Sequence, residues 1–336
     1  MANQEPRKHH YIPRFILKNF NDDNHQVNYW NIEKNELEKR NIKSVFMNID
    51  MYRDEELNED DPTQIESKFS IFECEIAELI AKKILDKSEI ILTRRELEKL
   101  RIFATLLSFR SNLRMEQYKN DQFDTSTREK LLKFQPDGNF EELWKRELDV
   151  LATCRSYDEI QKSEVIDPII KLDFNNDLMG YYMTFVDARG GQFLLSDIYP
   201  TLEIFPMMPS VNIHLHCMFP LSPTRMLLLN HIMFKNKDDR DPISGPMIKM
   251  SQIKGDAIVP PNNRYKSYGT LNPDDEYIYK VRKVYANDVE YINALFLNET
   301  KVGVIFREKD RIKSSISSFN RRTDTKQTFD KLEEML

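Results

Sequence analysis

The spacing of apolar side chains predicts amphipathic helices in the middle of the chain. From Ile65 to Ile84, apolar residues recur every three or four positions, which is the spacing of one helix face. The same period runs from Leu97 to Leu113. Further helical patterns cover residues 125–134, 139–154 and 157–171. The middle third of the chain is therefore expected to form a helical layer.

Strand patterns lie on both sides of this helical stretch. Residues 26–32 and 36–42 alternate loosely around an asparagine turn, which predicts a β-hairpin. Residues 181–188 and 192–197 are separated by Arg189-Gly190-Gly191, which predicts a second hairpin. Later predictions are buried strands over 211–219 and 225–229, a loop-rich stretch over 236–275, a closing helix over 276–298 and a strand over 301–306.

Strands before and after a helical stretch indicate an α+β protein, with a mostly antiparallel sheet and a helical layer or insertion in the middle of the chain. Hydrophobic residues make up 40% of the sequence and charged residues 31%, which is enough apolar material for a folded core. We expect one mixed body in four segments: an N-terminal arm and β-hairpin packing on the main body (1–60), a helical region (61–172), a mainly β region with a closing helix and strand (173–310), and a basic, partly flexible C-terminal tail (311–336).

Composition argues against several functional classes. The eight glycines are placed so that neither a G-x-x-x-x-G-K-[ST] loop nor a G-x-G-x-x-G turn occurs, so the standard phosphate-cradling loops are not expected. No stretch approaches the roughly 18 apolar residues that span a bilayer, and the first residues lack the apolar core of a secretion signal. Three widely spaced cysteines indicate free thiols. We expect a cytoplasmic protein with no membrane contact.

The formal net charge is −6, but the charges are unevenly distributed. Residues 50–61 carry seven acidic side chains and one basic one, whereas residues 301–326 carry eight basic and three acidic ones. Both runs fit solvated surface segments. The basic run also has the charge to meet a polyanion such as nucleic acid. A further hypothesis is that the acidic run masks the basic run as an internal competitor.

The segment from His9 to Pro13 resembles the start of the His-Me finger nucleases, in which a histidine pair precedes an isoleucine or valine and a proline. That resemblance implies that His10 acts as a general base on water while one metal ion stabilises the leaving phosphate oxygen. The chain departs from the pattern, because no histidine follows His25 until His214. The alternative for His10 is a structural side chain that anchors the N-terminal arm through a backbone carbonyl.

Three polar residues form a candidate metal site. Asp197 follows the apolar run 193–195, so it stands where a strand leaves the sheet, a common place for a catalytic or ligand-binding carboxylate. His214 and His216 are two positions apart on a predicted strand, so both lie on one sheet face. Imidazole and carboxylate ligands suit zinc or manganese, and the expected cofactor is a divalent metal, Mn, Mg or Zn. The alternatives are a turn-capping Asp197 and histidines hydrogen-bonded in or beside the core.

Arginines provide a candidate anion site. Arg110 and Arg114 stand one helical turn apart, so both guanidinium groups can reach one anion or, alternatively, pair with the acidic run. The remaining members of the expected binding set are His9, Ser196 and Arg225. Ser196 has no G-x-S-x-G context, so serine-hydrolase chemistry is not expected.

A longer resemblance covers most of the chain. The segments HHYIPRFILKNF, IESKFSIFECEIAELI, QFLLSDIYP and FPLSPTRMLLL occur in the order typical of the family catalogued as domain of unknown function 4238, with the helix that carries Arg110 after the second. The closing DVEYINALFLNETKVGVIF is similar to the family's terminal helix and strand. The chain departs from the family where Ser111-Asn112 replaces a proline-containing turn and where two residues separate Asp197 from Pro200. The resemblance implies no activity.

Two functions of different class stay open. In the first, His10 as base and Asp197 with His216 as metal ligands make a metal-assisted phosphodiesterase or nuclease, and the basic run holds nucleic acid or another phosphate-bearing ligand. In the second, the protein is a non-catalytic sensor or interaction module in a bacterial defence or mobile-element setting, and its helical layer binds a protein partner. Whether the chain is an enzyme depends on whether those side chains converge. We favour a nucleic-acid-directed role.

Overall fold

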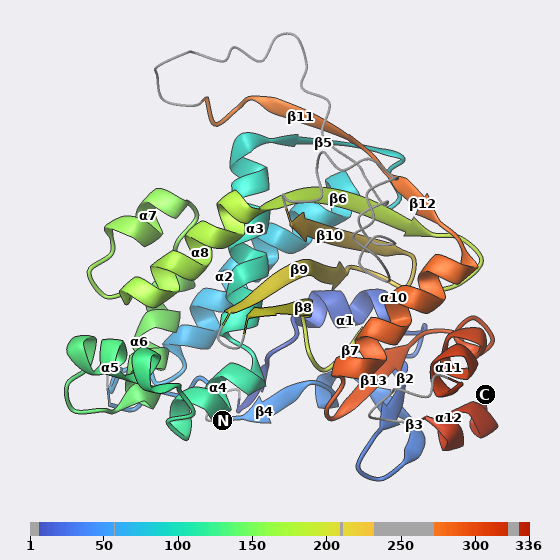
Figure 1. Cartoon of the computed structure of the whole chain (residues 1–336), viewed down its shortest axis with the longest axis horizontal. Coiled ribbons are helices and arrows are strands. Elements are labelled where there is room, and N and C mark those ends of the chain that lie inside the picture. The colour runs from blue at the N-terminus through green and yellow to red at the C-terminus, as the bar shows by residue number, and fades with distance from the viewer. Residues whose placement is uncertain (1–6, 57, 209–210, 232–271, 322–328) are drawn as a thin grey trace, which may run out of the picture. The chain divides into compact units, whose positions relative to one another are not determined.

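A computed structural model describes residues 7–56, 58–208, 211–231, 272–321 and 329–336. The protein has the expected α+β fold with mostly antiparallel sheets (Figure 1). Contacts between Cα atoms divide the chain into two compact units. The helical unit takes its described residues from Met1–Pro13, Phe46–Ile80 and Arg95–Met179, and the sheet unit takes its own from Arg14–Val45, Ala81–Arg94 and Gly180–Leu336.

The helical unit is built from the amphipathic segments in the middle of the chain, as the sequence predicts. Apart from one terminal residue each of α3 and α8, it contains α2 (Gln64–Leu79), α3 (Arg94–Phe109), α4 (Asn112–Lys119), α5 (Thr125–Phe134), α6 (Phe140–Leu151), α7 (Tyr157–Lys162) and α8 (Pro168–Gly180). A short antiparallel sheet pairs β1 (Lys8–His10) with β4 (Met47–Ile49). A π-helical turn, Ile80–Ile84, follows α2.

Polar caps explain where several of these helices begin. A helix leaves its first amide groups without partners inside the helix, and a side-chain oxygen just before the first turn can accept from one of them. Ser111 accepts from the amide of Arg114, so the stretch predicted as one helix to Leu113 forms two, α3 and α4. Equivalent caps start α5, α6 and α7 at Asp124, Asn139 and Ser156.

Aromatic side chains fill the core of the helical unit. Trp144 of α6 is fully buried, and its indole Nε1 donates to the carbonyl of Phe109 at 3.0 Å. The ring of Tyr52 is also fully buried and lies 5.2 Å from the ring of Phe69 and 5.9 Å from that of Trp144, centroid to centroid. Such ring pairs stabilise beyond their buried area. The acidic run 50–61 therefore contains a core residue and is only partly a solvated surface segment.

The described residues of the sheet unit form three sheets. The largest has the order β12 (Arg282–Val284), β6 (Tyr181–Ala188), β10 (Arg225–His231), β9 (Val211–Pro220) and β8 (Thr201–Met208). A four-stranded antiparallel sheet has the order β3 (Glu36–Asn41), β2 (Gln26–Asn31), β13 (Gly303–Phe306) and β7 (Leu195–Ser196). The third sheet pairs β11 (Glu276–Lys280) with β5 (Glu89–Thr93). Among the described strands, the pairing of β12 with β6 alone is parallel.

The predicted pairing of strands holds where the partner is close in sequence. The hairpin of β2 and β3 is confirmed, with Asn35 in the turn at φ 57°. The strands over 211–219 and 225–229 are confirmed as the antiparallel neighbours β9 and β10. The hairpin across Arg189-Gly190-Gly191 is wrong, because β6 pairs with β10 and β12 whereas β7 pairs with β13 in another sheet. That glycine turn marks a change of sheet.

Helix α10 (Ala286–Glu299) packs on β7 and supplies much of the core of the sheet unit (Figure 1). The helix predicted over 276–298 is wrong at its start, because β5 and β6 hold residues 276–284 as β11 and β12. The strand predicted over 301–306 is confirmed as β13. Gly303 begins this strand, where a Cβ atom would overlap the carbonyl oxygen of Trp30 in β2.

Short helices complete the sheet unit. They are α1 (Arg14–Phe20), a 3-10 turn (Ile42–Ser44), α11 (Lys313–Asn320) and α12 (Asp330–Met335). The segment 311–336, expected to be a tail, thus contains α11 and α12, which place Ile316 and Leu332 in the hydrophobic core. Most of the loop-rich stretch predicted over 236–275 lies outside the described residues. None of the helices described is both long and apolar enough for a membrane crossing.

Candidate functional site

The N-terminal histidines lie in the helical unit beside Tyr52 and Arg110. His9 is fully buried, and its Nδ1 accepts from the amide of Tyr52 at 2.9 Å, so Nδ1 carries no hydrogen. The imidazole of His9 stacks on the ring of Tyr52 with centroids 5.5 Å apart. The carbonyl of His10, a residue 7% exposed, accepts from Nη2 of Arg110 at 2.5 Å. These contacts anchor β1 inside the unit.

Arg110 is engaged within the protein on several sides. It is 1% exposed, and its Nη1 lies 2.7 Å from Oε1 of Glu73. Its guanidinium also lies over the ring of Phe69, 4.3 Å from the centroid, where a cation is attracted to the aromatic face. Arg114 instead donates from Nη1 to Oε1 of Gln117 at 3.0 Å. The two guanidinium groups therefore have separate partners.

Asp197 and Ser196 lie in the sheet unit at the end of β7. Oδ1 of Asp197 accepts from the amides of Lys301 at 2.9 Å and Gly303 at 3.3 Å. Oγ of Ser196 accepts from the amide of Ile198 at 3.1 Å in the turn that follows β7. Burial raises the pKa of the Asp197 carboxyl, and hydrogen bonds from backbone amides oppose that shift. Asp197 thus fixes the turn between α10 and β13.

The second histidine pair belongs to β9. His216 is fully buried, and its Nδ1 lies 2.7 Å from Oδ1 of Asn230, its cross-strand partner on β10. His214 pairs through its backbone with Ile204 of β8. Within the part of the chain that the structure describes, no three His, Cys, Asp or Glu side chains gather as a metal site requires. His10 belongs to the helical unit and Asp197 and His216 to the sheet unit, so their convergence stays a prediction.

Arg225, at the start of β10, connects distant parts of the sheet unit. Its Nη1 donates to the carbonyl of Ile84 at 2.6 Å and its Nη2 to the carbonyl of Lys87 at 2.9 Å. Its Nε donates to Oδ1 of Asp187 on β6 at 3.3 Å. Every nitrogen of this 5% exposed side chain therefore has an acceptor in the protein. Arg225 fixes the backbone that carries Lys87 to the end of the large sheet.

Arg225 lines a pocket of about 480 Å³ that we call the basic pocket. Strand register brings its centre together, because Lys283 of β12 and Arg225 of β10 are both paired with Asp187 of β6. Side chains paired in this way project from the same face of a sheet. Five cations and two carboxylates line the pocket, an excess of three positive charges. The cations are Lys87, Arg189, Arg225, Lys283 and Arg311, and the carboxylates are Asp86 and Asp187.

The cations of the basic pocket differ in their partners. Nη2 of Arg189 lies 2.8 Å from Oδ2 of Asp187, and Nε of Arg311 lies 2.8 Å from Oε2 of Glu308. These two arginine side chains are 53% and 52% exposed, so their ion pairs are weak and exchangeable. Lys87 and Lys283 are exposed and have no ion-pair partner in the described parts of the chain. The two lysines are therefore available to an anion.

Sequence reasoning identified Arg225 and, within the basic run, Arg311, but it missed the other cations of the basic pocket. Lys87, Arg189 and Lys283 stand far apart in the chain, and no local motif connects them. One usable signal was the glycine turn directly after β6. Gly190 there has φ 83°, which a glycine adopts easily, and the turn places Arg189 in the pocket lining.

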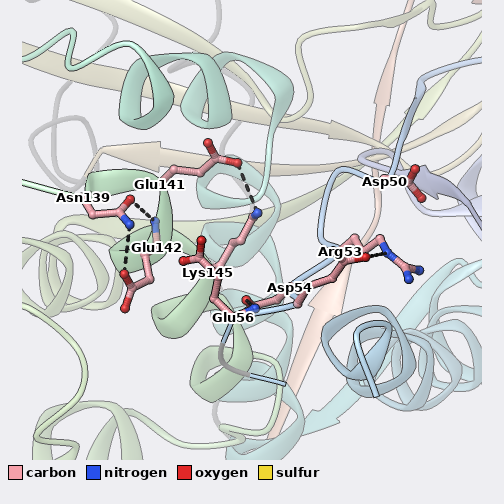
Figure 2. A pocket seen from close by; sticks show the side chains of 9 residues that line it. Asp50, Arg53, Asp54, Glu56, Asn139, Glu141, Glu142 and Lys145 are labelled. Carbon is pink, nitrogen blue, oxygen red and sulfur yellow. Dashed lines mark hydrogen bonds and ion pairs between the residues drawn. The ribbon is translucent and has the colours of Figure 1, made fainter. Parts of the chain in front are cut away.

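The helical unit contains a pocket of opposite charge, about 410 Å³ in volume, which we call the acidic pocket. Figure 2 shows Nζ of Lys145 directed at Glu141, with an N···O distance of 3.1 Å. Asn139 caps α6, and Glu141 and Glu142 stand in its first turn, where the helix dipole favours negative charge. The other charged lining residues are Asp50, Arg53, Asp54, Glu55 and Glu56. Local helix and loop chemistry accounts for much of this charge.

Comparison with known protein families gives a match to the chain. The family model described as Protein of unknown function (DUF4238) matches residues 8–310. The chain belongs to this family. The resemblance found in the sequence is confirmed, and the match spans most of both units while ending just before Arg311. No curated protein and no solved structure matches the chain.

This DUF4238 protein also contains a buried carboxyl pair that sequence reasoning missed. Glu147 of α6 is fully buried, and its Oε1 accepts from the amide of Asp167 at 2.7 Å. Oδ1 of Asp167, a residue 1% exposed, accepts from the amides of Ile169 at 2.6 Å and Ile170 at 3.2 Å at the start of α8. Burial, followed by the negative charge of Asp167, raises the pKa of Glu147 well above its ordinary value.

Proposed function

We propose that the protein is a nucleic-acid-directed binding factor that holds phosphate in the basic pocket. The observation that carries the proposal is the convergence of Lys87, Arg189, Lys283 and Arg311 around a sheet end held together by Arg225. Lysine and arginine neutralise phosphate and release the counterions condensed on it. Because the whole chain carries −6, a local positive pocket attracts a polyanion that most of the surface repels.

The contacts of Asp197 favour binding over cleavage. A metal ligand needs a lone pair directed at the ion, and two backbone amides already donate to Oδ1 of Asp197. The contact of His216 with Oδ1 of Asn230 uses a hydrogen on Nδ1 and no lone pair, so it does not decide between the two functions. The catalytic alternative assigns His10 as base and Asp197, His214 and His216 as ligands of Mn, Mg or Zn. The experiment below also tests this catalytic alternative.

Fluorescence anisotropy with labelled single-stranded and duplex DNA and RNA, measured on the full chain over a salt series, tests the proposal. We expect Lys87→Glu combined with Lys283→Glu to weaken binding by about tenfold or more and to reduce the slope of log K against log salt by roughly 2. The matched control combines Lys119→Glu with Lys130→Glu, exposed positions on α4 and α5 of the helical unit. We expect the control to stay within about twofold of the parent chain.

Three results would overturn the proposal. Equal losses in both double variants mean that net charge alone governs binding and that the basic pocket has no special part. Absence of binding to every nucleic acid at about 50 mM salt removes the nucleic-acid role itself. Cleavage of the labelled strand in the presence of Mn²⁺, lost in His10→Ala and in Asp197→Ala, replaces the binding role with the catalytic alternative.

A further inference from the structure

The cations of the basic pocket come from separate segments of the chain and line one pocket. Lys283 and Arg189 flank the end of β6, Lys87 comes just before β5, and Arg311 comes just before α11. A nucleic-acid strand carries one charge per phosphate along its length, and proteins that follow it spread their cations along a groove. Cations that converge from separate segments instead match a group with more than one charge at a single point.

The size and charge of the basic pocket indicate the same kind of group. Its volume of about 480 Å³ falls in the range of roughly 300–1,000 Å³ that is typical of small-ligand sites. A phosphate monoester carries about −1.5 to −2 at neutral pH, whereas an internal phosphodiester carries about −1. The lining has an excess of three positive charges, or two when the Glu308 partner of Arg311 is counted, and this excess stabilises the monoester more than the diester.

Asp187 and Arg225 hold the cations in place. Asp187 lies between Nε of Arg225 at 3.3 Å and Nη2 of Arg189 at 2.8 Å. Arg225 uses its remaining nitrogens on the carbonyls of Ile84 and Lys87. The groups left to meet a ligand are the side chains of Lys87, Lys283, Arg189 and Arg311. Arg189 and Arg311 can also offer the forked pair of N–H donors that fits a phosphate.

We propose that the basic pocket binds a terminal phosphate, at the end of a nucleic-acid strand or on a free nucleotide, in preference to an internal phosphodiester. The inference rests on the proposed function, because it names the group that the same pocket recognises. The two sources share one chemistry, a phosphate monoester on a nucleoside, and separate strands and nucleotides distinguish them.

The test compares short DNA strands of one sequence that end in a 5′-phosphate, a 3′-phosphate or hydroxyl groups only. We expect at least one phosphorylated strand to bind the full chain about tenfold more tightly than the hydroxyl strand, equivalent to about 1.4 kcal/mol. Lys87→Glu with Lys283→Glu is expected to remove this preference, whereas Lys119→Glu with Lys130→Glu is expected to keep it. Circular dichroism and thermal unfolding show whether each variant is folded.

Competition then identifies the source of the phosphate. A nucleoside monophosphate should displace the phosphorylated strand, and the matching nucleoside should not. Equal affinities of nucleotide and phosphorylated strand support a free nucleotide, whereas tighter binding of the strand supports a strand end.

Each remaining outcome separates this inference from the proposed function. If phosphorylated and hydroxyl strands bind equally and both weaken in the Lys87 and Lys283 variant, the terminal phosphate is refuted and nucleic-acid binding stands. If the nucleotide binds and no strand does, the terminal phosphate stands and the nucleic-acid role is refuted. If neither strands nor nucleotide bind, both proposals fail.

Discussion

The acidic and basic pockets are similar in size, about 410 and 480 Å³, but they are built in different ways. The carboxylates of the acidic pocket come from two short stretches, residues 50–56 and residues 141–142. Its ion pairs are local too, because Lys145 reaches Glu141 one helical turn away and Arg53 reaches Glu55 two residues away. These ion pairs follow from the local sequence, although the packing of the helical unit brings the two stretches together.

The basic pocket depends instead on contacts between distant segments. Arg225 reaches backbone carbonyls that are 141 and 138 residues away, and its register with Asp187 requires β6 and β10 to pair. Bringing like charges together raises the energy of the folded state, so the fold maintains this cluster against electrostatic repulsion. A charge cluster that local helix chemistry explains needs no ligand. One that several strands assemble is the better candidate for a binding site.

The largest expected difference between the two pockets is in the free energy of unfolding that is lost when one arginine of each is replaced. Arg225→Met removes the hydrogen bonds to Oδ1 of Asp187 and to two backbone carbonyls, and we expect the free energy of unfolding to fall by about 3–5 kcal/mol. Arg53→Met removes a pair with an exposed carboxylate, and we expect a fall of less than about 1 kcal/mol. Urea unfolding of both variants measures the difference. Equal losses would contradict the contrast between a tertiary and a local cluster.

The next largest effect is expected on the pH dependence of stability, and it comes from the burial of one carboxylate of the helical unit, Glu147. Because the folded-state pKa of Glu147 is raised, the folded chain holds a proton there that the unfolded chain releases above about pH 4.3. The stability from this proton is complete below that pH and is lost as pH rises toward the folded-state pKa, by at most about 1.4 kcal/mol per pH unit. Glu147→Gln keeps a hydrogen at every pH and should flatten this fall.

The measurement is the free energy of unfolding of the parent chain and of Glu147→Gln between about pH 4 and pH 8. The variant should gain on the parent as pH rises, whereas Glu56→Gln, at an exposed position of the acidic pocket, should run parallel to it. A Glu147→Gln curve parallel to the parent would show that Glu147 ionises normally.

Features that depend on residues close together in the chain could be predicted from the sequence, whereas features that depend on distant segments could not. The amphipathic helices α2 and α6 depend on a local period, α6 also depends on its local cap, and the β2–β3 hairpin depends on one asparagine turn. These features were predictable. The glycine turn after β6 was read as a hairpin because its sequence is a good turn, but the β10 and β12 partners of β6 lie elsewhere in the chain.

The candidate site was predictable only in part, for the same reason. Arg225 is predicted as a binding residue, and its contacts with the carbonyls of Ile84 and Lys87 at the sheet end could not be predicted from the sequence. Nothing in the sequence distinguishes Lys283 from other lysines, and only the register places it across Asp187 from Arg225. The acidic run was visible at once, but the buried ring of Tyr52 inside it was not.

The smallest effect is expected from the carboxylates at the rim of the acidic pocket. Deleting residues 50–61 would remove the core residue Tyr52, so Glu55→Gln with Glu56→Gln is the cleaner test of whether the acidic run masks the basic run. Because both carboxylates are exposed, we expect stability within about 0.5 kcal/mol of the parent chain. Nucleic-acid affinity should rise by less than about twofold, since salt screens the interactions of exposed charges. A tenfold rise at low salt that vanishes at high salt would instead support masking, and the acidic pocket would then regulate the basic one.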